Sequence, residues 1–230
     1  MSFPFVSRDE MDRKVAGLKS RTRIVTVFLL YIGIGMAAGA AHGQEDCRLT
    51  VLGDSLTAGY GVPEGQSFPD QLSRALDREG IDCDVINAGV SGDTSAGGLA
   101  RLDWVLSDKP THLLVELGAN DGLRALATDQ LEANLDSIIV RAKAAGVSVM
   151  LAGMLAPPNL GRAYGDDFAR VFRDVADRHE VPLYPFFLNG VAAEPDYLIE
   201  DALHPNADGI ARITDLILPE IIHWLRPEIE

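Results

Sequence analysis

Cysteine and basic residues are both scarce in this sequence. Two cysteines among 230 residues are too few for a small domain held together by disulfides. There are 20 Lys and Arg residues against 34 Asp and Glu residues, which gives a formal net charge of −14. A nucleic-acid-binding protein needs basic surface to neutralise phosphates, so this charge argues against that class of function. An anionic membrane surface would also repel the chain, which leaves a local apolar site as the route to lipid contact.

Internal repeats, low-complexity tracts and interdomain linkers are absent as well. Hydrophobic residues make up 47% of the chain, which excludes collagen and long disorder and indicates a globular protein. The length suits one α/β domain, or at most two small ones, with a core of its own. The cysteines form no CxxC motif and no zinc-ligand spacing, so the sequence predicts neither a redox centre nor a metal site.

Residues 1–43 have the layout of a secretory signal peptide. Basic residues precede an uncharged apolar run at 24–41, and small residues follow up to a cleavage site that would make Gln44 the mature N-terminus. The alternative is an uncleaved anchor, because a run of about 18 residues almost reaches the length of a membrane-spanning helix. The glycines and alanines of the run favour cleavage. Translation could start at Met1 or at Met11.

The remaining residues, 44–230, are expected to form the mature domain, in the periplasm or secreted. Cleavage would remove six basic and three acidic residues and leave a net charge of −17. No stable membrane insertion is expected after cleavage. Cys47 and Cys83 each precede an apolar, strand-like run, so in an oxidising compartment they predict a disulfide between the starts of two neighbouring strands. Two buried thiols are the alternative.

Strand-like and helix-like segments alternate along this domain. The strand-like runs lie at 48–53, 84–87, 112–117, 147–151 and 182–186, and the helical patterns at 67–80, 94–107, 128–146, 166–179 and 207–225. Such alternation predicts a doubly wound, flavodoxin-like α/β sandwich of three layers with a mostly parallel five-stranded sheet. In a sheet of this kind, ligands bind outside the carboxyl ends of the strands.

Residues that can carry chemistry follow the predicted strands. Ser55 comes directly after the first strand, Gly89 follows the second, and Asn120 follows the third. Near the C-terminus, Asp201 precedes His204 by three residues, a separation at which one turn brings a carboxylate to imidazole Nδ1 and leaves Nε2 facing outward. Each feature alone has an ordinary interpretation as a turn, a helix cap or a surface pair. Together, at one sheet edge, they predict a single cleft.

In this order, the segments resemble the four sequence blocks of the SGNH hydrolase superfamily, also called GDSL hydrolases. The matching stretches are GDSL, NAGVSGDT, GAND and DALHP. The resemblance spans about residues 48–225 and is closest to the bacterial periplasmic thioesterase I, lysophospholipase and arylesterase group. Ala119 departs from that group, which commonly has glycine there, and the cysteine pair is a second departure.

The resemblance implies a serine hydrolase that needs no metal or cofactor. Ser55 would be the nucleophile, His204 the general base, and Asp201 the residue that orients the imidazole. The oxyanion would be bound by the N–H groups of Ser55 and Gly89 and by the side chain of Asn120.

The resemblance also implies small-molecule or lipid ester substrates: aryl esters, acyl thioesters and lysophospholipids. Leu123 and Leu126, after the third strand, and Leu155, Pro157 and Pro158, after the fourth, predict an apolar acyl pocket, with ordinary loop packing as the alternative. A glycan O-acetyl esterase is a second hypothesis, but it would need a shallow polar cleft lined with aromatics. A non-catalytic binding protein of the cell envelope is a third.

Overall fold

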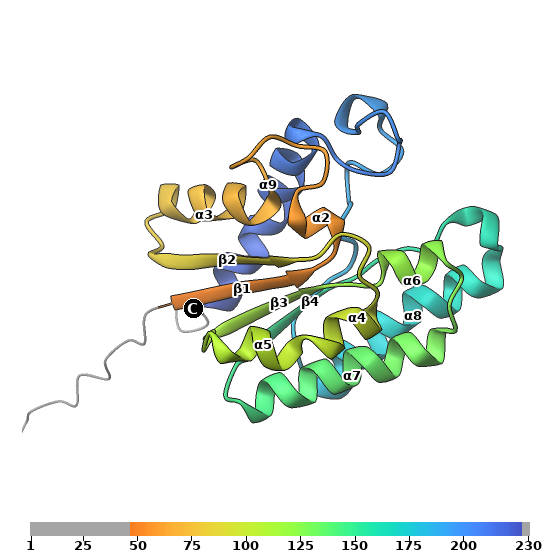
Figure 1. The fold of residues 1–230 in the computed structure, drawn as a ribbon, viewed down its shortest axis with the longest axis horizontal. Coiled ribbons are helices and arrows are strands. Elements are labelled where there is room, and N and C mark those ends of the chain that lie inside the picture. The colour runs from red at the N-terminus through yellow and green to blue at the C-terminus, as the bar shows by residue number, and fades with distance from the viewer. Residues whose placement is uncertain (1–46, 227–230) are drawn as a thin grey trace, which may run out of the picture. The chain divides into compact units, whose positions relative to one another are not determined.

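The computed structural model describes residues 47–226, and the predicted signal peptide at 1–43 lies outside them. Within the described residues, five parallel strands form one sheet in the order β2-β1-β3-β4-β5 (Figure 1). The strands are β1 (Cys47–Gly53), β2 (Cys83–Gly89), β3 (His112–Glu116), β4 (Ser148–Ala152) and β5 (Leu183–Tyr184). The chain winds outward in both directions from β1, so the predicted flavodoxin-like α/β class is confirmed.

Helices cover both faces of this sheet. Figure 1 shows α3 and α9 on one face and α4, α5, α7 and α8 on the other. The helices are α2 (Ser55–Ala58), α3 (Phe68–Arg78), α4 (Ser95–Ala100), α5 (Leu102–Ser107), α6 (Ala119–Leu123), α7 (Thr128–Ala144), α8 (Arg162–His179) and α9 (Ala207–Leu225), with 3-10 turns η1 (Pro158–Leu160) and η2 (Pro195–Tyr197). Over residues 47–226, no helix combines the length and the apolar character needed to cross a bilayer.

The strands β1, β3 and β4 are buried on both faces, which explains their continuous apolar runs. Leu49, Val51 and Leu52 of β1 and Leu113 and Leu114 of β3 have no exposed surface. A parallel sheet between two helical layers needs apolar side chains at successive positions rather than at alternate ones. This packing holds the carboxyl ends of β1 and β3 side by side, and the loops that follow them start from a rigid edge.

Several helix ends lie where the sequence predicts them. Ser67 caps α3 in a capping box, in which the N–H of Asp70 donates to Ser67 Oγ and the N–H of Ser67 donates to Asp70 Oδ2. Gly80 follows the end of this helix with φ 68°. α9 occupies the predicted residues 207–225. These ends were predictable because they depend on contacts between close neighbours in the chain.

Two helical predictions are wrong in their details. The predicted helix at 94–107 is divided into α4 and α5 at Arg101. Gly98 lies inside α4, where a Cβ would come within 2.3 Å of a Leu117 side-chain carbon, so this glycine allows close packing against the end of β3. The fourth helix, α8, begins at Arg162 rather than at 166.

The structure joins the two cysteines in a disulfide at the amino ends of β1 and the edge strand β2. Cys47 and Cys83 are the first residues of β1 and β2, they are direct partners in the parallel register, and their Cα atoms are 4.5 Å apart. The bond closes a loop with a sequence separation of 36. It lies at the opposite end of the strands from the residues that follow their carboxyl ends.

Removing this disulfide is expected to reduce stability and to leave activity intact. Replacing Cys47 and Cys83 together by serine should lower the free energy of unfolding by about 3–4 kcal/mol, because the unfolded chain regains the entropy of an open loop. Urea unfolding of the oxidised wild type and the double variant measures the difference. The kcat of the folded variant should match that of the wild type. A double variant as stable as the wild type would contradict this prediction.

Candidate active site

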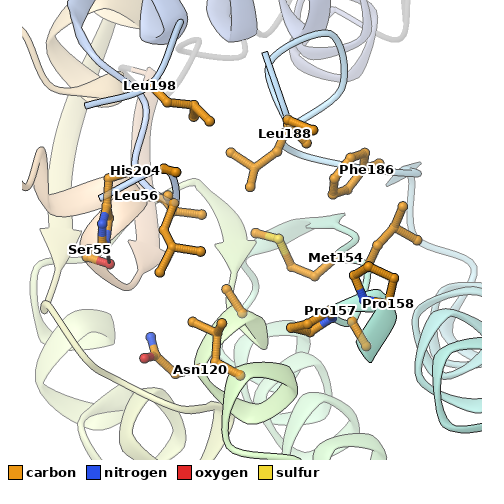
Figure 2. Close-up of a pocket in the computed structure, with 18 residues that line it drawn as sticks. Ser55, Leu56, Asn120, Met154, Pro157, Pro158, Phe186, Leu188, Leu198 and His204 are labelled. Atoms are coloured by element: carbon orange, nitrogen blue, oxygen red, sulfur yellow. Dashed lines mark hydrogen bonds between the residues drawn. The ribbon is translucent and has the colours of Figure 1, made fainter. Parts of the chain in front are cut away.

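Ser55 and His204 meet at the carboxyl edge of the sheet. Ser55 is the first residue of α2 and is separated from the end of β1 only by Asp54, whereas His204 lies in the loop before α9. Their side chains are hydrogen-bonded, with Ser55 Oγ 2.8 Å from His204 Nε2 across a sequence separation of 149 (Figure 2). The fold therefore brings into contact a hydroxyl and an imidazole that the sequence predicts to share one cleft.

Asp201 holds the other side of the His204 ring. Its Oδ2 lies 2.6 Å from His204 Nδ1, and its Oδ1 accepts hydrogen bonds from the N–H groups of Leu203 (2.9 Å) and His204 (3.0 Å). Partial burial raises the pKa of Asp201, but the N–H donors and the imidazole outweigh it and hold this pKa at about 2. An ionised carboxylate only accepts hydrogen bonds, so Nδ1 carries the proton and Nε2 is the acceptor for the Ser55 hydroxyl.

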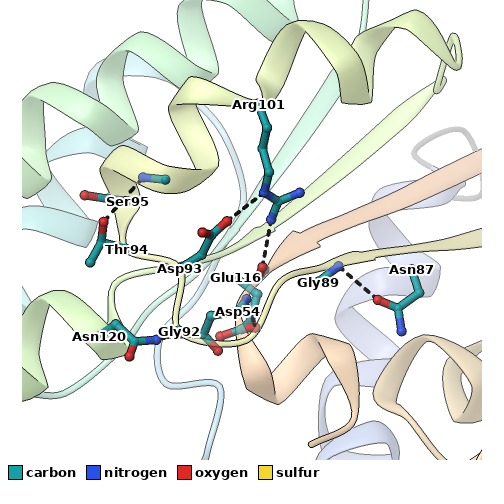
Figure 3. Close-up of polar contacts among 12 residues, drawn as sticks. Asp54, Asn87, Gly89, Gly92, Asp93, Thr94, Ser95, Arg101, Glu116 and Asn120 are labelled. Carbon is teal, nitrogen blue, oxygen red and sulfur yellow. Dashed lines mark hydrogen bonds and ion pairs between the residues drawn. The ribbon is translucent and has the colours of Figure 1, made fainter.

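Asn120 and Gly89, the other predicted oxyanion residues, differ in their surroundings. Asn120 lies in α6, lines the pocket next to Ser55, and donates from Nδ2 to Asp54 Oδ2 at 3.1 Å. Gly89 ends β2, and its N–H donates to Asn87 Oδ1 at 2.9 Å (Figure 3). A Cβ at Gly89 would lie 2.3 Å from the backbone nitrogen of Ala58, so only glycine fits against α2. Gly89 is not among the residues that line the pocket.

The aspartates next to these motifs hold local structure. Asp54 caps α2 by accepting from the N–H of Leu56 at 3.0 Å. Asp121 accepts from both the N–H and the hydroxyl of Ser95. Asp93 pairs with the Arg101 guanidinium at 2.7 Å instead of capping the next helix, which is capped by a threonine. The contact between Asp54 and Asn120 has no local signature, since 66 positions separate the two residues.

An apolar pocket of about 530 Å³ opens beside Ser55 and His204 (Figure 2). Of the residues predicted from sequence, Leu123, Leu155, Pro157 and Pro158 line it, whereas Leu126 lies outside the lining. The opposite wall comes from the long segment between β5 and α9, which the sequence analysis does not assign to the pocket. Its lining residues are Phe186, Leu188, Ala192, Ala193, Leu198, Ala202 and Leu203. The sequence feature that could have identified this wall is the apolar stretch directly after the last strand, at the edge of the sheet where ligands bind.

These features define the protein's class. A serine, a histidine and a carboxylate are linked by consecutive hydrogen bonds at the carboxyl edge of a doubly wound sheet, beside a pocket for an apolar group. This is the arrangement of a serine hydrolase on an α/β fold.

Comparison with known proteins identifies the family. Residues 51–212 match the GDSL-like lipase/acylhydrolase family, and the chain belongs to it. It is 39% identical over 187 residues to an arylesterase of Vibrio mimicus, covering 81% of this chain and 94% of that protein. It is 37% identical over 195 residues to thioesterase 1/protease 1/lysophospholipase L1 of Escherichia coli strain K12, covering 84% of this chain and 90% of that protein.

A solved structure agrees with these sequence relatives. The psychrotrophic esterase EstA from Pseudoalteromonas sp., in a crystal structure inhibited by monoethylphosphonate, is 36% identical and superimposes with a TM-score of 0.75, over 79% of this chain and all of that one. The resemblance to SGNH hydrolases is confirmed, and the protein is an ester-hydrolysing enzyme.

Proposed function

We propose that this enzyme hydrolyses carboxyl esters and thioesters with aliphatic acyl chains, through an acyl-enzyme on Ser55. Candidate substrates are aryl esters, acyl thioesters and lysophospholipids, the classes named for its relatives. The observation that carries the proposal is the hydrogen-bonded series Ser55–His204–Asp201 at the mouth of an apolar pocket.

Each residue of this series has a defined task in the proposed reaction. As Ser55 Oγ attacks the ester carbonyl, its proton moves to His204 Nε2, and Asp201 stabilises the imidazolium through Nδ1–H. The tetrahedral intermediate then expels the alcohol or thiol, which takes the proton from Nε2. A water molecule attacks the acyl-enzyme by the same route, so that the acid is released and Ser55 regains its proton.

We assign the oxyanion to the N–H groups of Ser55 and Gly89 and the side chain of Asn120. The Asn120 amide has two N–H groups, and Asp54 accepts from its nitrogen, so one of the two remains for the substrate oxygen. The Gly89 N–H is hydrogen-bonded to Asn87 Oδ1. To donate to an oxyanion, this N–H must either donate to both acceptors at once or give up its hydrogen bond to Asn87.

The apolar lining supports aliphatic acyl groups over acetyl groups on glycans. An acyl chain that enters the pocket loses contact with water, and each buried CH₂ group contributes about 0.8 kcal/mol. The value of kcat/KM for p-nitrophenyl esters is therefore expected to rise from C2 to C8, by up to about fourfold per CH₂ group. Steady-state assays across the series measure this slope, and a series that falls from C2 onward would favour an acetyl esterase.

A pair of matched substitutions tests whether this pocket is responsible. Leu188→Asp places a carboxylate in the pocket wall and should lower kcat/KM for the C8 ester while sparing the C2 ester. Leu126→Asp introduces the same charge at a partly exposed leucine outside the lining and should leave both esters unchanged. Equal effects of the two substitutions would contradict the pocket assignment. Acyl-CoA and lysophosphatidylcholine, assayed with the wild type, then distinguish the thioesterase and lysophospholipase activities.

We propose further that the enzyme is exported to the periplasm or secreted, and that residues 1–43 are removed. The basic flank, the apolar run and the small residues before Gln44 support this proposal. N-terminal sequencing of the exported protein is expected to begin at Gln44. Recovery of the chain in the membrane fraction with its N-terminal segment intact would favour the anchor instead. No nucleic-acid partner is proposed, since the net charge is strongly negative.

A further inference from the structure

Asp54 connects the turn that carries the nucleophile to the side chain of Asn120. The Asp54 side chain is fully buried. Its Oδ1 accepts from the N–H of Leu56 at 3.0 Å, which holds the first turn of α2, and its Oδ2 accepts from Asn120 Nδ2 at 3.1 Å. Figure 3 shows the two side chains pointing toward each other. One carboxylate therefore serves both the helix that begins at Ser55 and the amide of Asn120.

An asparagine amide has two orientations of nearly the same shape, which exchange its oxygen and its NH₂ group. Only the NH₂ group can donate to an oxyanion, whereas the oxygen would repel it. With an ionised carboxylate at Asp54, an exchange of the two groups would place the Asn120 oxygen against Asp54 Oδ2, where both atoms are acceptors. Figure 2 shows the Asn120 nitrogen on the side of Ser55. The Asp54 carboxylate thus selects the orientation that the oxyanion needs.

A second buried acid, Glu116, lies directly against this contact. It ends β3 and is fully buried, and its Oε2 accepts from the Thr57 hydroxyl at 2.6 Å and from the Asp54 N–H at 3.4 Å. Burial, and then the charge of Asp54, raises the pKa of Glu116 well above its usual value. Burial raises the pKa of Asp54 to about 6, opposed by its donors Leu56 and Asn120 and by His204. At neutral pH, above the pKa of Asp54, the Asp54 carboxylate is the ionised form, whereas burial favours the neutral form of Glu116.

We propose that Asp54 is a positioning residue, which holds the Asn120 amide with its NH₂ group toward the substrate oxygen and excludes the reversed orientation. The proposal depends on the role of Asn120 in the oxyanion site given above. In this proposal Asp54 does not contact the substrate, because it acts only through Asn120.

A double-mutant cycle tests this relationship. Asn120→Ala is expected to lower kcat by about 10²–10³-fold with a smaller change in KM. Asp54→Asn keeps the shape and the cap acceptor but presents an NH₂ group to Asn120, so the Asn120 amide reverses and kcat should fall by at least 10²-fold. In the Asn120→Ala background, Asp54→Asn should lower kcat by less than threefold, since no amide remains to orient. Labelling with a fluorophosphonate counts the active sites, so that kcat refers to folded enzyme.

Glu116→Gln provides the matched control. It makes the same change of carboxyl to amide at the neighbouring buried acid and keeps an acceptor for the Thr57 hydroxyl and the Asp54 N–H. Burial favours the neutral form of Glu116, which the amide imitates. It should retain kcat within about threefold of the wild type, by the same criterion as in the cycle. A loss as large as that of Asp54→Asn would overturn the proposal, because it would reflect damage to the buried cluster as a whole.

The remaining outcomes separate this inference from the proposed function. If Asn120→Ala lowers kcat but Asp54→Asn does not, or if the two losses multiply in the double variant, Asp54 does not act through Asn120, and only the inference fails. If Asn120→Ala leaves kcat unchanged, the assignment of Asn120 to the oxyanion site fails with it.

Discussion

Replacement of Ser55 by alanine is expected to lower kcat by about 10⁶-fold, as loss of the nucleophile does in other serine hydrolases. Alanine at this position removes the only hydroxyl hydrogen-bonded to His204 Nε2 among the described residues. The pocket and the oxyanion donors remain, so the activity left is what binding and charge stabilisation alone supply. Rapid mixing with an activated p-nitrophenyl ester should show a burst for the wild type and none for the variant, and mass spectrometry should find the added acyl group only on the wild type.

Ser137→Ala is the matched control for this experiment. Ser137 is a half-buried residue of α7, and its hydroxyl donates to the carbonyl of Ala133. Its replacement should preserve the burst and kcat. An acyl group on the Ser55→Ala protein would mean that another residue is the nucleophile, and the proposed mechanism would be wrong.

Asp201→Asn is expected to lower kcat by about 10⁴-fold with little change in structure. Asparagine can still accept from the N–H groups of Leu203 and His204 through its oxygen. Its NH₂ group, however, would donate to Nδ1 of His204 and move the imidazole proton to Nε2. An imidazole with a proton on Nε2 cannot accept the proton of Ser55. The loss should appear in kcat for p-nitrophenyl esters and leave KM close to that of the wild type.

A second histidine–aspartate pair in the same chain offers the control. His179 Nε2 lies 2.8 Å from Asp136 Oδ1, on α8 and α7, and this contact lowers the pKa of Asp136. Asp136→Asn makes the same chemical change away from the pocket, so kcat should be unchanged. An Asp201→Asn enzyme within tenfold of wild-type kcat would contradict the role given to Asp201.

Most of the fold could be predicted because it rests on local patterns. Strands buried on both faces appear as continuous apolar runs, and helix ends follow from caps such as Ser67 and from glycines such as Gly80. The break at Arg101 could not be predicted. It coincides with side-chain hydrogen bonds from the guanidinium to Asp93 and to the carbonyl of Gly53, two residues outside α4 and α5.

The candidate site divides in the same way. Ser55, Asn120, Asp201 and His204 could be named from the sequence because each stands in a recognisable segment and follows a strand or precedes the last helix. The far wall of the pocket, with Phe186 among its residues, could not, since an apolar loop has the same composition whether it lines a pocket or packs on the core.

By itself, the sequence determined the class of fold, the order of the strands and helices, and the chemical groups available at the carboxyl edge of the sheet. These properties depend on hydrophobic periodicity and on contacts between residues that are close together in the chain, and both can be read from the sequence. Only the tertiary structure decided which groups touch. It placed Ser55 Oγ 2.8 Å from His204 Nε2 and paired Asp54 with Asn120. A hydrogen bond forms only within a narrow range of donor–acceptor distances and directions. For residues that are 66 or 149 positions apart in the sequence, only the packing of the whole sheet determines that geometry.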